Sequence, residues 1–582
     1  MKTNIQVFLI IVTFCVTIIS CNKPKENKLP EAVSYNFTPK DTTWKSLSIR
    51  QKIGQTMIVR AYYKEQIQQF GSVENMIQKY PVGGIFVPPW IFLDTPDRSK
   101  VIANIKEAVA DYEKHSQFPM IVTEDFERGV GSVYHEFTNL PSEMALGATN
   151  NPDLAYKFGS AVAKEAKVLG INWLLHPLVD LNKHPLQDLV IERAISDDAD
   201  KAYPLLKAQT KGMHEQNVVS TLKHFPGDGA TIKNQHLVTS ANNLSVTEWN
   251  KTFGAMYQKL INEGTPSIMV GHIRFPAYQK EKYKGRVLPA TLSKELMTGL
   301  LKEKMKFNGV IMSDALNMGG VAGYYKNNLE TTIEAFKAGV DLVLWPDLKF
   351  MDSLEVRIKR GDIPMSRLND AVERIWGVRE QYGLLKKKPS LFYEISENET
   401  KTIQKNAQEI ANNAVTLVQG VENIPLKPSE IKSIAIVNIS HNSRTEELKY
   451  TQKLLQEKGF KVETIIHNPG FLDWEYKLSF FDKYDKILVA MENRYFSPIG
   501  TSLFKDKEAL AIWTMGMFPP EKIIAVSYSN PYYVKLYFEE AFIGINAYSL
   551  DRFSQKAVVD ALTGCIPFKG VSPVKLEHDI LK

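Results

Sequence analysis

Cysteine is nearly absent from this sequence, and long apolar runs are confined to its first twenty residues. The three cysteines are Cys15, Cys21 and Cys565, too few for a disulfide framework or a cysteine zinc site. No run of five or more basic residues occurs and the formal net charge is only +6, so no nucleic-acid partner is expected. Hydrophobic residues make up 44% and charged residues 23%, which excludes wholesale disorder and collagen-like repeats.

The N-terminus has the composition of an export signal. Lys2 precedes an apolar stretch from Val7 to Ile19 that only two threonines interrupt. Roughly 13 residues are too few to cross a bilayer but suit a signal peptide. The stretch ends in Ile18-Ile19-Ser20-Cys21, which resembles a bacterial lipobox and implies lipidation of Cys21. Cleavage as an ordinary signal peptide is the alternative.

These features predict four segments: a lipoprotein signal peptide (1–20), a polar tether (21–43), a first domain (44–388) and a second domain (389–582). A lipid on Cys21 would anchor the protein to a bacterial membrane, in the cell envelope, on its periplasmic or outer-surface face. No later stretch has about 18 uninterrupted apolar residues, so no other membrane span is expected. The sequence says nothing about oligomeric state.

In the first domain, short apolar runs alternate with longer amphipathic stretches such as Asp153–Leu169 and Ser293–Met305. This alternation predicts parallel βα units, and about eight of them predict an α/β fold of the (β/α)8-type TIM barrel. Most runs lack polar alternation, as strands covered on both faces do. The predicted strands are Thr56–Val59, Gly84–Val87, Met120–Thr123, Ile171–Leu175, Val218–Leu222, Ser267–Gly271, Gly309–Ser313 and Leu342–Trp345.

The pattern of the second domain predicts a smaller α/β sandwich. Helical patterns such as Glu446–Glu457 and Phe553–Leu562 separate its apolar runs. No Gly-x-Gly-x-x-Gly follows the first run, so a dinucleotide site is not supported. The predicted strands are Ile434–Val437, Val462–Ile466, Ile487–Ala490, Ile523–Ser527 and Phe542–Ala547.

Several barrel strands end in side chains capable of chemistry. The C-terminal ends of barrel strands meet at one mouth, where catalytic sites are built. The alternative is that strands end in polar residues because the loops that follow them are exposed to solvent. Five strands that end in such residues favour a shared site. They are Glu124-Asp125, His176, Lys223-His224, His272 and Asp314.

The segment Lys223-His224-Phe225-Pro226-Gly227-Asp228-Gly229, followed by Asn234-Gln235-His236, resembles the signature of glycoside hydrolase family 3. It is most similar to the β-N-acetylhexosaminidase branch, which usually reads Lys-His-Phe-Pro-Gly-His-Gly and then Asp-Ser-His. The resemblance covers nearly all of the chain after the tether, more loosely in the second domain. Further segments agree in order: Ile53-Gly54-Gln55, 140–149, 170–173, 177–180, 288–293, 309–316 and 338–341.

Breaking a glycosidic bond requires an anion beneath the sugar ring and a proton donor at the leaving oxygen. The resemblance implies that Asp314 is the nucleophile of a retaining mechanism and that His236, on a mobile loop, donates the proton. Histidine suits this role because its ordinary pKa lies near working pH. Capping of a following helix is the alternative role for Asp314.

Two positions around the expected proton donor depart from the family pattern. Asn234 stands where an aspartate usually orients and charges the histidine. Asparagine brings no charge to raise the pKa of His236, and the corresponding change in a serine-protease triad costs roughly 10⁴-fold in rate. Activity is therefore reduced, re-routed or absent, unless Asp228, where the family usually has histidine, supplies the missing carboxylate. Contact with substrate or with water is the alternative for Asp228.

The resemblance also implies four substrate-binding residues, Asp125, Arg193, Lys223 and His224. The family arginine eight residues after that aspartate is missing, since Val133 stands there, and Arg128 replaces a glycine. Buried ion pairing is the alternative role for the lysine and the histidine. His176 and His272 are interpreted as structural residues that line the barrel.

The leading hypothesis is a lipid-anchored, retaining exo-glycosidase that releases β-linked N-acetylglucosamine from cell-wall or glycan fragments, as in peptidoglycan turnover. Its partners are then a carbohydrate substrate and a membrane, and no metal or organic cofactor is implied. The alternatives are a β-glucosidase of the same family and a glycan-binding lipoprotein with impaired catalysis. Linkage, aglycone and the choice between hydrolysis and transfer to phosphate stay open.

Overall fold

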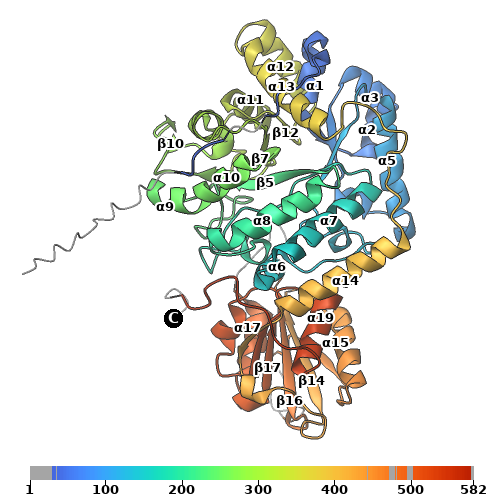
Figure 1. The fold of residues 1–582 in the computed structure, drawn as a ribbon, viewed down its shortest axis with the longest axis vertical. Helices are drawn as coiled ribbons and strands as arrows, with labels where there is room; N and C mark the ends of the chain where they lie inside the picture. Colours follow the sequence, from blue (N-terminus) through green and yellow to red (C-terminus); the bar gives the residue numbers. More distant parts are fainter. Residues whose placement is uncertain are drawn as a thin grey trace, which may run out of the picture.

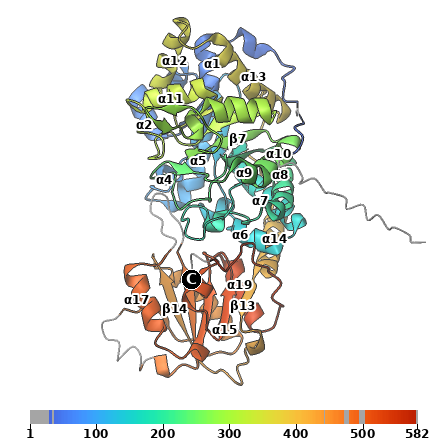
Figure 2. The same ribbon diagram turned by 90° about the vertical axis from the view of Figure 1, so that its left-hand side faces the viewer.

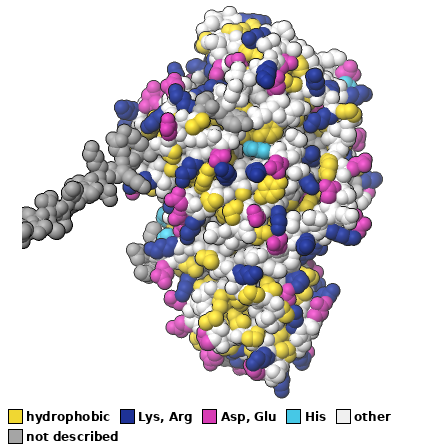
Figure 3. Space-filling view, viewed as in Figure 1, with side chains coloured by type: hydrophobic (Ala, Val, Ile, Leu, Met, Phe, Trp, Pro, Cys, Tyr) yellow, Lys and Arg dark blue, Asp and Glu magenta, His cyan; other side chains and the backbone are white. Residues whose placement is uncertain are grey.

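The computed structural model describes residues 29–33, 36–441, 443–470, 479, 481–493 and 503–578. It shows two α/β bodies, one above the other (Figure 1). The predicted signal peptide, Cys21 and residues 22–28, 34 and 35 of the tether lie outside the described residues. Within the described ranges, no helix has both the length and the apolar character that a membrane crossing requires. Positive and negative side chains are intermixed over the face seen in Figure 3.

The upper body is a barrel of eight parallel strands, which confirms the predicted fold. Its strand order is β11-β7-β5-β4-β3-β2-β1-β12, and a bridge from Met312 to Leu342 joins the two ends of the sheet. The strands are β1 (Met57–Arg60), β2 (Gly84–Phe86), β3 (Ile121–Glu124), β4 (Trp173–Leu174), β5 (Val219–Phe225), β7 (Ser267–Val270), β11 (Val310–Ser313) and β12 (Val343–Leu344).

Helices surround this barrel and bury the outer faces of its strands. The predicted helix Asp153–Leu169 is α7, which begins at Pro152 because the Asn151 side chain caps it. The predicted helix Ser293–Met305 is a π-helix over Glu295–Lys304. The α-helices are α1 (Ile49–Gln55), α2 (Tyr63–Phe70), α3 (Val73–Lys79), α4 (Pro89–Phe92), α5 (Val101–His115), α6 (Glu143–Thr149), α7 (Pro152–Val168), α8 (Ala199–His214), α9 (Val246–Lys251), α10 (Phe253–Asn262), α11 (Asn328–Ala338), α12 (Lys349–Lys359) and α13 (Met365–Gln381).

Helices α7 and α8 approach so closely that glycine is required at their contact. A Cβ atom at Gly159 would lie 2.0 Å from the carbonyl oxygen of Gln209. We expect Gly159→Ala to lower the free energy of unfolding by about 1–3 kcal/mol, because the two helix backbones must separate. Urea unfolding of the variant measures this loss.

Gly299 offers a matched control, since it is also helical but has nothing within 4 Å of the corresponding Cβ position. Gly299→Ala should be neutral or stabilising by up to about 1 kcal/mol, because alanine loses less backbone entropy on folding. Equal effects of the two substitutions would contradict the close-packing explanation.

The lower body is the predicted α/β sandwich. Its parallel strands run in the order β18-β17-β16-β14-β15, and β13 (Thr416–Gln419), which the sequence did not predict, pairs antiparallel with β18. The other strands are β14 (Ile434–Ser440), β15 (Ile465–His467), β16 (Lys486–Glu492), β17 (Ile523–Ser527) and β18 (Ile543–Asn546). The helices are α14 (Glu397–Ala414), α15 (Thr445–Glu457), α17 (Asp506–Met515), α18 (Tyr533–Tyr537) and α19 (Arg552–Leu562).

The two bodies meet along α14, which packs against α6 and α7 of the barrel and α19 of the sandwich (Figure 2). The Ser142 hydroxyl donates to the carbonyl of Tyr548 at 2.8 Å, and the Ser196 hydroxyl donates to that of Pro573 at 2.6 Å. Both serines lie on loops that follow β3 and β4. The sandwich therefore supports the mouth side of the barrel.

The described end of the predicted tether is folded onto the barrel. Phe37 is 3% exposed and packs in a cluster with Ile375 and Val378 of α13. The backbone N–H groups of Lys40 and Asp41 donate to the carboxylate of Glu380. The apolar ring of Phe37 therefore holds part of the 21–43 segment against the body.

Candidate active site

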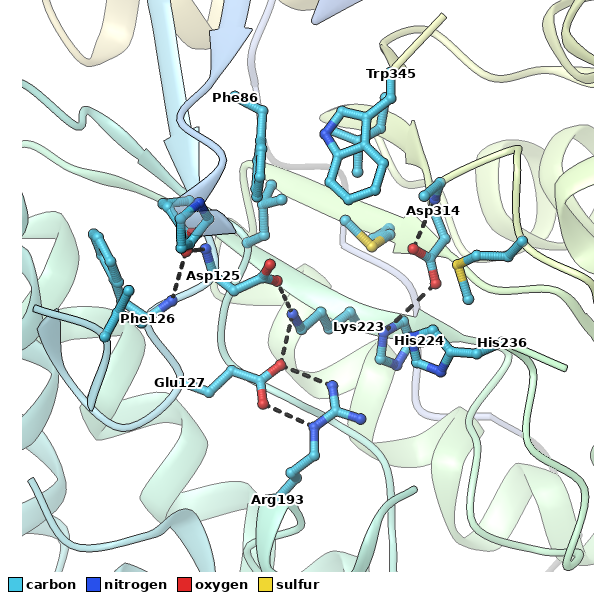
Figure 4. Close-up of a pocket in the computed structure, with 18 of the residues that line it drawn as sticks. Phe86, Asp125, Phe126, Glu127, Arg193, Lys223, His224, His236, Asp314 and Trp345 are labelled. Atoms are coloured by element: carbon cyan, nitrogen blue, oxygen red, sulfur yellow. Dashed lines mark hydrogen bonds and ion pairs between the residues drawn. The ribbon is translucent and has the colours of Figure 1, made fainter. Parts of the chain in front are cut away.

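A cavity of about 650 Å³ lies at the C-terminal ends of the barrel strands, where the sequence predicts a shared site. Strand ends supply part of its lining, and the segments that follow β2, β3, β4, β5 and β11 supply the rest (Figure 4). The structure brings all six predicted catalytic and substrate-binding residues to this cavity: Asp125, Arg193, Lys223, His224, His236 and Asp314.

Four charged side chains form a connected network along one wall. Nζ of Lys223 donates to Oδ1 of Asp125 at 2.6 Å and lies 2.8 Å from Oε1 of Glu127. Glu127 also accepts from Nε and Nη2 of Arg193, both at 2.8 Å. Paired contacts of this kind fix the guanidinium plane. The wall therefore presents hydrogen-bonding groups in a fixed arrangement (Figure 4).

The network keeps its charges although it is buried. Burial alone would lower the pKa of Lys223, but Asp125 and Glu127 raise it above its usual range. Burial favours protonation of Glu127, yet Arg193 and Lys223 hold the pKa of that carboxyl well below its ordinary value. The Asp125 side chain stays 45% exposed, so its carboxylate is open to accept hydrogen bonds from ligand hydroxyls.

Asp314 follows β11 and points into the same cavity. Its Oδ1 accepts from the N–H of Ala315 at 2.7 Å, and its Oδ2 lies 3.8 Å from Nε2 of His224. Burial alone would raise the pKa of Asp314. His224, His272 and His236, together with the Ala315 N–H, lower it by more than burial raises it, so the net pKa is below the ordinary value. Asp314 is therefore an ionised carboxylate near neutral pH, the state that a nucleophile requires.

Asp180 orients the imidazole beside Asp314. Its Oδ2 lies 2.7 Å from Nδ1 of His224, and its Oδ1 accepts from the N–H groups of His224 and Asp228. A histidine held at Nδ1 by a carboxylate presents Nε2 to its other neighbour. Asp180 thus holds His224 with its Nε2 3.8 Å from Oδ2 of Asp314.

His236 lies on the loop between β5 and β6 (Ser240–Ala241). Oδ1 of Asn234 lies 3.0 Å from both its backbone N and its Nδ1, so the asparagine contacts the ring although it brings no charge. Burial lowers the pKa of His236 to about 4, although Asp314 opposes this shift. The imidazole is therefore neutral near pH 7.

Asp228 belongs to the same loop and is not one of the residues that line the cavity. It is fully buried, and its Oδ1 accepts from the N–H of Gly229 and the hydroxyl of Ser240. Its backbone N–H donates to Asp180, so its contacts support the partner of His224 rather than His236. Burial and then the charge of Asp180 raise its pKa to about 7. The suggestion that it faces water is wrong.

The two histidines interpreted as structural are fully buried. His272 lies 2.9 Å from both the Thr291 hydroxyl and the carbonyl of Ala315, next to the residue that holds Asp314. His176 lies 3.0 Å from Oε1 of Glu143. Over the part of the chain that the structure describes, no group of three or more His, Cys, Asp or Glu is placed to hold a metal ion.

Three lining or supporting residues escaped the sequence analysis. Glu127 lies two residues after Asp125 in the same segment, and this spacing was the available signal. Asp180 ends the segment 177–180, which resembles the family sequence but gives no indication of a role for the aspartate. Trp345, the last residue of a predicted strand, lines the cavity. Its role depends on neighbours from other strands, which a single sequence does not show.

Comparison with known proteins places these features in a family. The family model described as "Glycosyl hydrolase family 3 N terminal domain" matches residues 48–378. A protein of Cellulomonas fimi named "Beta-N-acetylglucosaminidase/beta-glucosidase" is 26% identical over 568 residues, covering 92% of this chain and 94% of that protein. The "Beta-hexosaminidase A" of Pseudoalteromonas piscicida is 31% identical over 52% of this chain, which spans 51% of that relative.

Solved structures resemble both bodies together. A beta-glucoside phosphorylase has a TM-score of 0.80 and 26% identity, covering 92% of this chain and 95% of that one. A family 3 beta-N-acetylglucosaminidase from a Paenibacillus strain has a TM-score of 0.76 and 23% identity, covering 91% and 99%. At 23% identity, the similarity to the Paenibacillus structure supports the fold alone.

Proposed function

Because the chain belongs to glycosyl hydrolase family 3 and is on that ground a glycosidase, we propose that it releases terminal β-linked N-acetylglucosamine with retention of configuration. One observation carries the proposal. Asp314 and His236 line a single cavity whose wall bears the charged network of Asp125, Glu127, Lys223 and Arg193. The hexosaminidase and N-acetylglucosaminidase names of several relatives support the choice of sugar.

In the first step, the wall network binds the ring hydroxyls of the terminal sugar and Asp314 lies beneath its anomeric carbon. A carboxylate oxygen of Asp314 bonds to that carbon while the bond to the leaving oxygen breaks, and His236 delivers a proton to this oxygen. The aglycone departs as an alcohol. A covalent glycosyl–enzyme ester at Asp314 is left behind.

In the second step, His236 acts as the base. Its neutral imidazole takes a proton from water, the water oxygen bonds to the anomeric carbon, and the ester bond to Asp314 breaks. Two inversions give net retention. His224, held by Asp180 at 2.7 Å, keeps the departing carboxylate in place for the next cycle.

Transfer to phosphate is a second candidate for the same second step. A beta-glucoside phosphorylase is similar in structure over nearly the whole chain, and both His236 and Asn234 are neutral near pH 7. A neutral imidazole does not repel an anionic acceptor, whereas a carboxylate at that position would. Phosphate oxygen would then replace water, and the product would be a sugar 1-phosphate.

A substrate panel tests the proposal. We expect the full chain to turn over 4-nitrophenyl β-N-acetylglucosaminide faster than the matching β-glucoside, with and without inorganic phosphate. Faster turnover of the glucoside would instead favour the β-glucosidase alternative. Stimulation by phosphate together with a sugar 1-phosphate product would show phosphorolysis. Calorimetric binding of N-acetylglucosamine without turnover of either glycoside would show a glycan-binding protein.

We also propose that a lipid on Cys21 anchors the enzyme in the cell envelope, where cell-wall fragments are available. The proposal depends on the lipobox-like Ile18-Ile19-Ser20-Cys21. Mass spectrometry of the membrane fraction should find the chain beginning at a diacylated Cys21. A Cys21→Ala variant should appear in the soluble fraction, and unchanged membrane association of that variant would contradict the anchor.

A further inference from the structure

The loop that carries His236 is fastened to the loop that begins at Asp314. The N–H of Gly319 donates to the carbonyl of His236 at 2.9 Å. The N–H of Gly320 donates to the carbonyl of Gln235 at 3.2 Å. Both glycines lie on the loop between β11 and α11. Two adjacent hydrogen bonds therefore join the loop of the expected proton donor to the loop of the expected nucleophile, and Figure 4 shows both side chains on the same side of the cavity.

The two loops approach so closely that a side chain would not fit between them. A Cβ atom at Gly319 would lie 2.3 Å from the carbonyl oxygen of Leu237, and one at Gly320 would lie 2.4 Å from that of Gln235. Such distances are too short for carbon and oxygen, so any other residue would push the loops apart. Among the described residues, only chain neighbours of Gly323 come within 4 Å of the corresponding position. The close approach is therefore confined to the contact beside His236.

The side chain of Gln235 fastens the same loop to the end of β7. It is fully buried, and its Oε1 accepts from the N–H of His272 at 2.7 Å. Nε2 of His272 lies 2.9 Å from the carbonyl oxygen of Ala315, the residue after Asp314. The family usually has serine in place of Gln235, and its side chain is two atoms shorter. The longer glutamine side chain is thus a feature of this chain that reaches the surroundings of Asp314.

These contacts fix His236 at its backbone, while Asn234 contacts its ring at Nδ1. A proton donor that a loop must first carry into place has to be ordered in each catalytic cycle, whereas a donor already in place does not. We propose that Gln235, Gly319 and Gly320 form a clamp that holds His236 in its working position before substrate binds. The three are positioning residues, and the proton donor is preassembled instead of being delivered by a mobile loop. This inference rests on the proposed glycosidase function.

Gly320→Ala tests the clamp, and Gly323→Ala on the same loop is the matched control. We expect Gly320→Ala to lower kcat/KM for N,N′-diacetylchitobiose by about 10²-fold, the order of loss when a reacting group is displaced by about 1 Å. The loss should be much smaller for 4-nitrophenyl β-N-acetylglucosaminide, because this leaving group departs without protonation. Gly323→Ala should keep both wild-type values. Equal losses for the two substrates would show a general structural defect and would overturn the inference.

Amide hydrogen exchange, followed by mass spectrometry, measures the clamp without turnover. In the wild type without sugar, the peptide that contains Gly319 and Gly320 should be protected, and N-acetylglucosamine should leave its exchange rate unchanged. Gly320→Ala should speed this exchange by about tenfold or more, because the N–H groups lose their acceptors on the other loop. Fast exchange in the free wild type that N-acetylglucosamine slows would show that the loop closes on the sugar, which contradicts a preassembled donor.

Gln235→Met replaces Gly320→Ala if far-UV circular dichroism shows that the alanine variant is unfolded. Methionine is close to glutamine in length and volume but has no amide oxygen to accept from the N–H of His272. It should show the same selective loss with N,N′-diacetylchitobiose, and a wild-type value would overturn the inference. If neither glycoside is turned over, the proposed function fails, and hydrogen exchange at Gly319 and Gly320 still decides whether the clamp exists.

Discussion

Asp314→Asn is expected to lower kcat for 4-nitrophenyl β-N-acetylglucosaminide by at least about 10⁴-fold, the order of loss seen when a covalent nucleophile is removed. An amide at this position cannot form the glycosyl ester. The three histidines that lower the pKa of Asp314 then have no anion to stabilise. Initial-rate kinetics on the folded variant measure the loss.

Covalent labelling separates a nucleophile from a residue that only binds substrate. A 2-deoxy-2-fluoro glycosyl fluoride should add one sugar mass to the wild type at the peptide containing Asp314, and none to the variant. Asp347→Asn is the matched control, because Asp347 is an exposed aspartate after β12. Its kinetics should be unchanged. Labelling at another residue would refute the assigned role.

His236→Ala is expected to lower kcat/KM by roughly 10²- to 10⁴-fold for substrates with poor leaving groups. The effect should be much smaller for activated aryl leaving groups, because they depart without protonation. A slope of log kcat/KM against leaving-group pKa measures this difference. Equal losses across the series would show that His236 only binds substrate.

The pH dependence should follow the same histidine. Because the pKa of His236 is about 4, the fraction of protonated His236 declines as pH rises above that value. The kcat/KM for substrates with poor leaving groups should therefore fall tenfold per pH unit. Asn234→Asp puts a carboxylate at the position that contacts Nδ1 at 3.0 Å and raises the pKa of His236. The fall in rate should then move to higher pH. An unchanged profile would show that another group titrates.

The barrel could be predicted because its strands are apolar on both faces and alternate with amphipathic helices. The site could be predicted in part, because parallel strands bring residues such as Lys223 and Asp314 to one mouth whatever lies between them. The predicted end of β5 was less accurate. The strand was predicted to stop at Leu222 but continues to Phe225, since that residue pairs with Val270 after a register shift.

Interactions between distant segments could not be predicted in the same way. Whether Glu127 binds Arg193 or faces solvent depends on how two loops approach each other. The contacts of Asp228 are a clearer case, because its place on the same loop as His236 does not show which segment packs around it. Its full burial and its bonds to Gly229 and Ser240 decide the matter.

The junction between the two bodies has a consequence for how this chain can be divided. Asp197, four residues from Arg193, accepts from the backbone N–H of Lys575, and Ala148 accepts from that of Val571. The last described stretch of the polypeptide thus braces the loop that carries Arg193, a residue of the cavity lining. Expressing the barrel without the second domain would remove these contacts. We therefore expect such a truncation, several hundred residues away in sequence, to weaken the affinity for sugar.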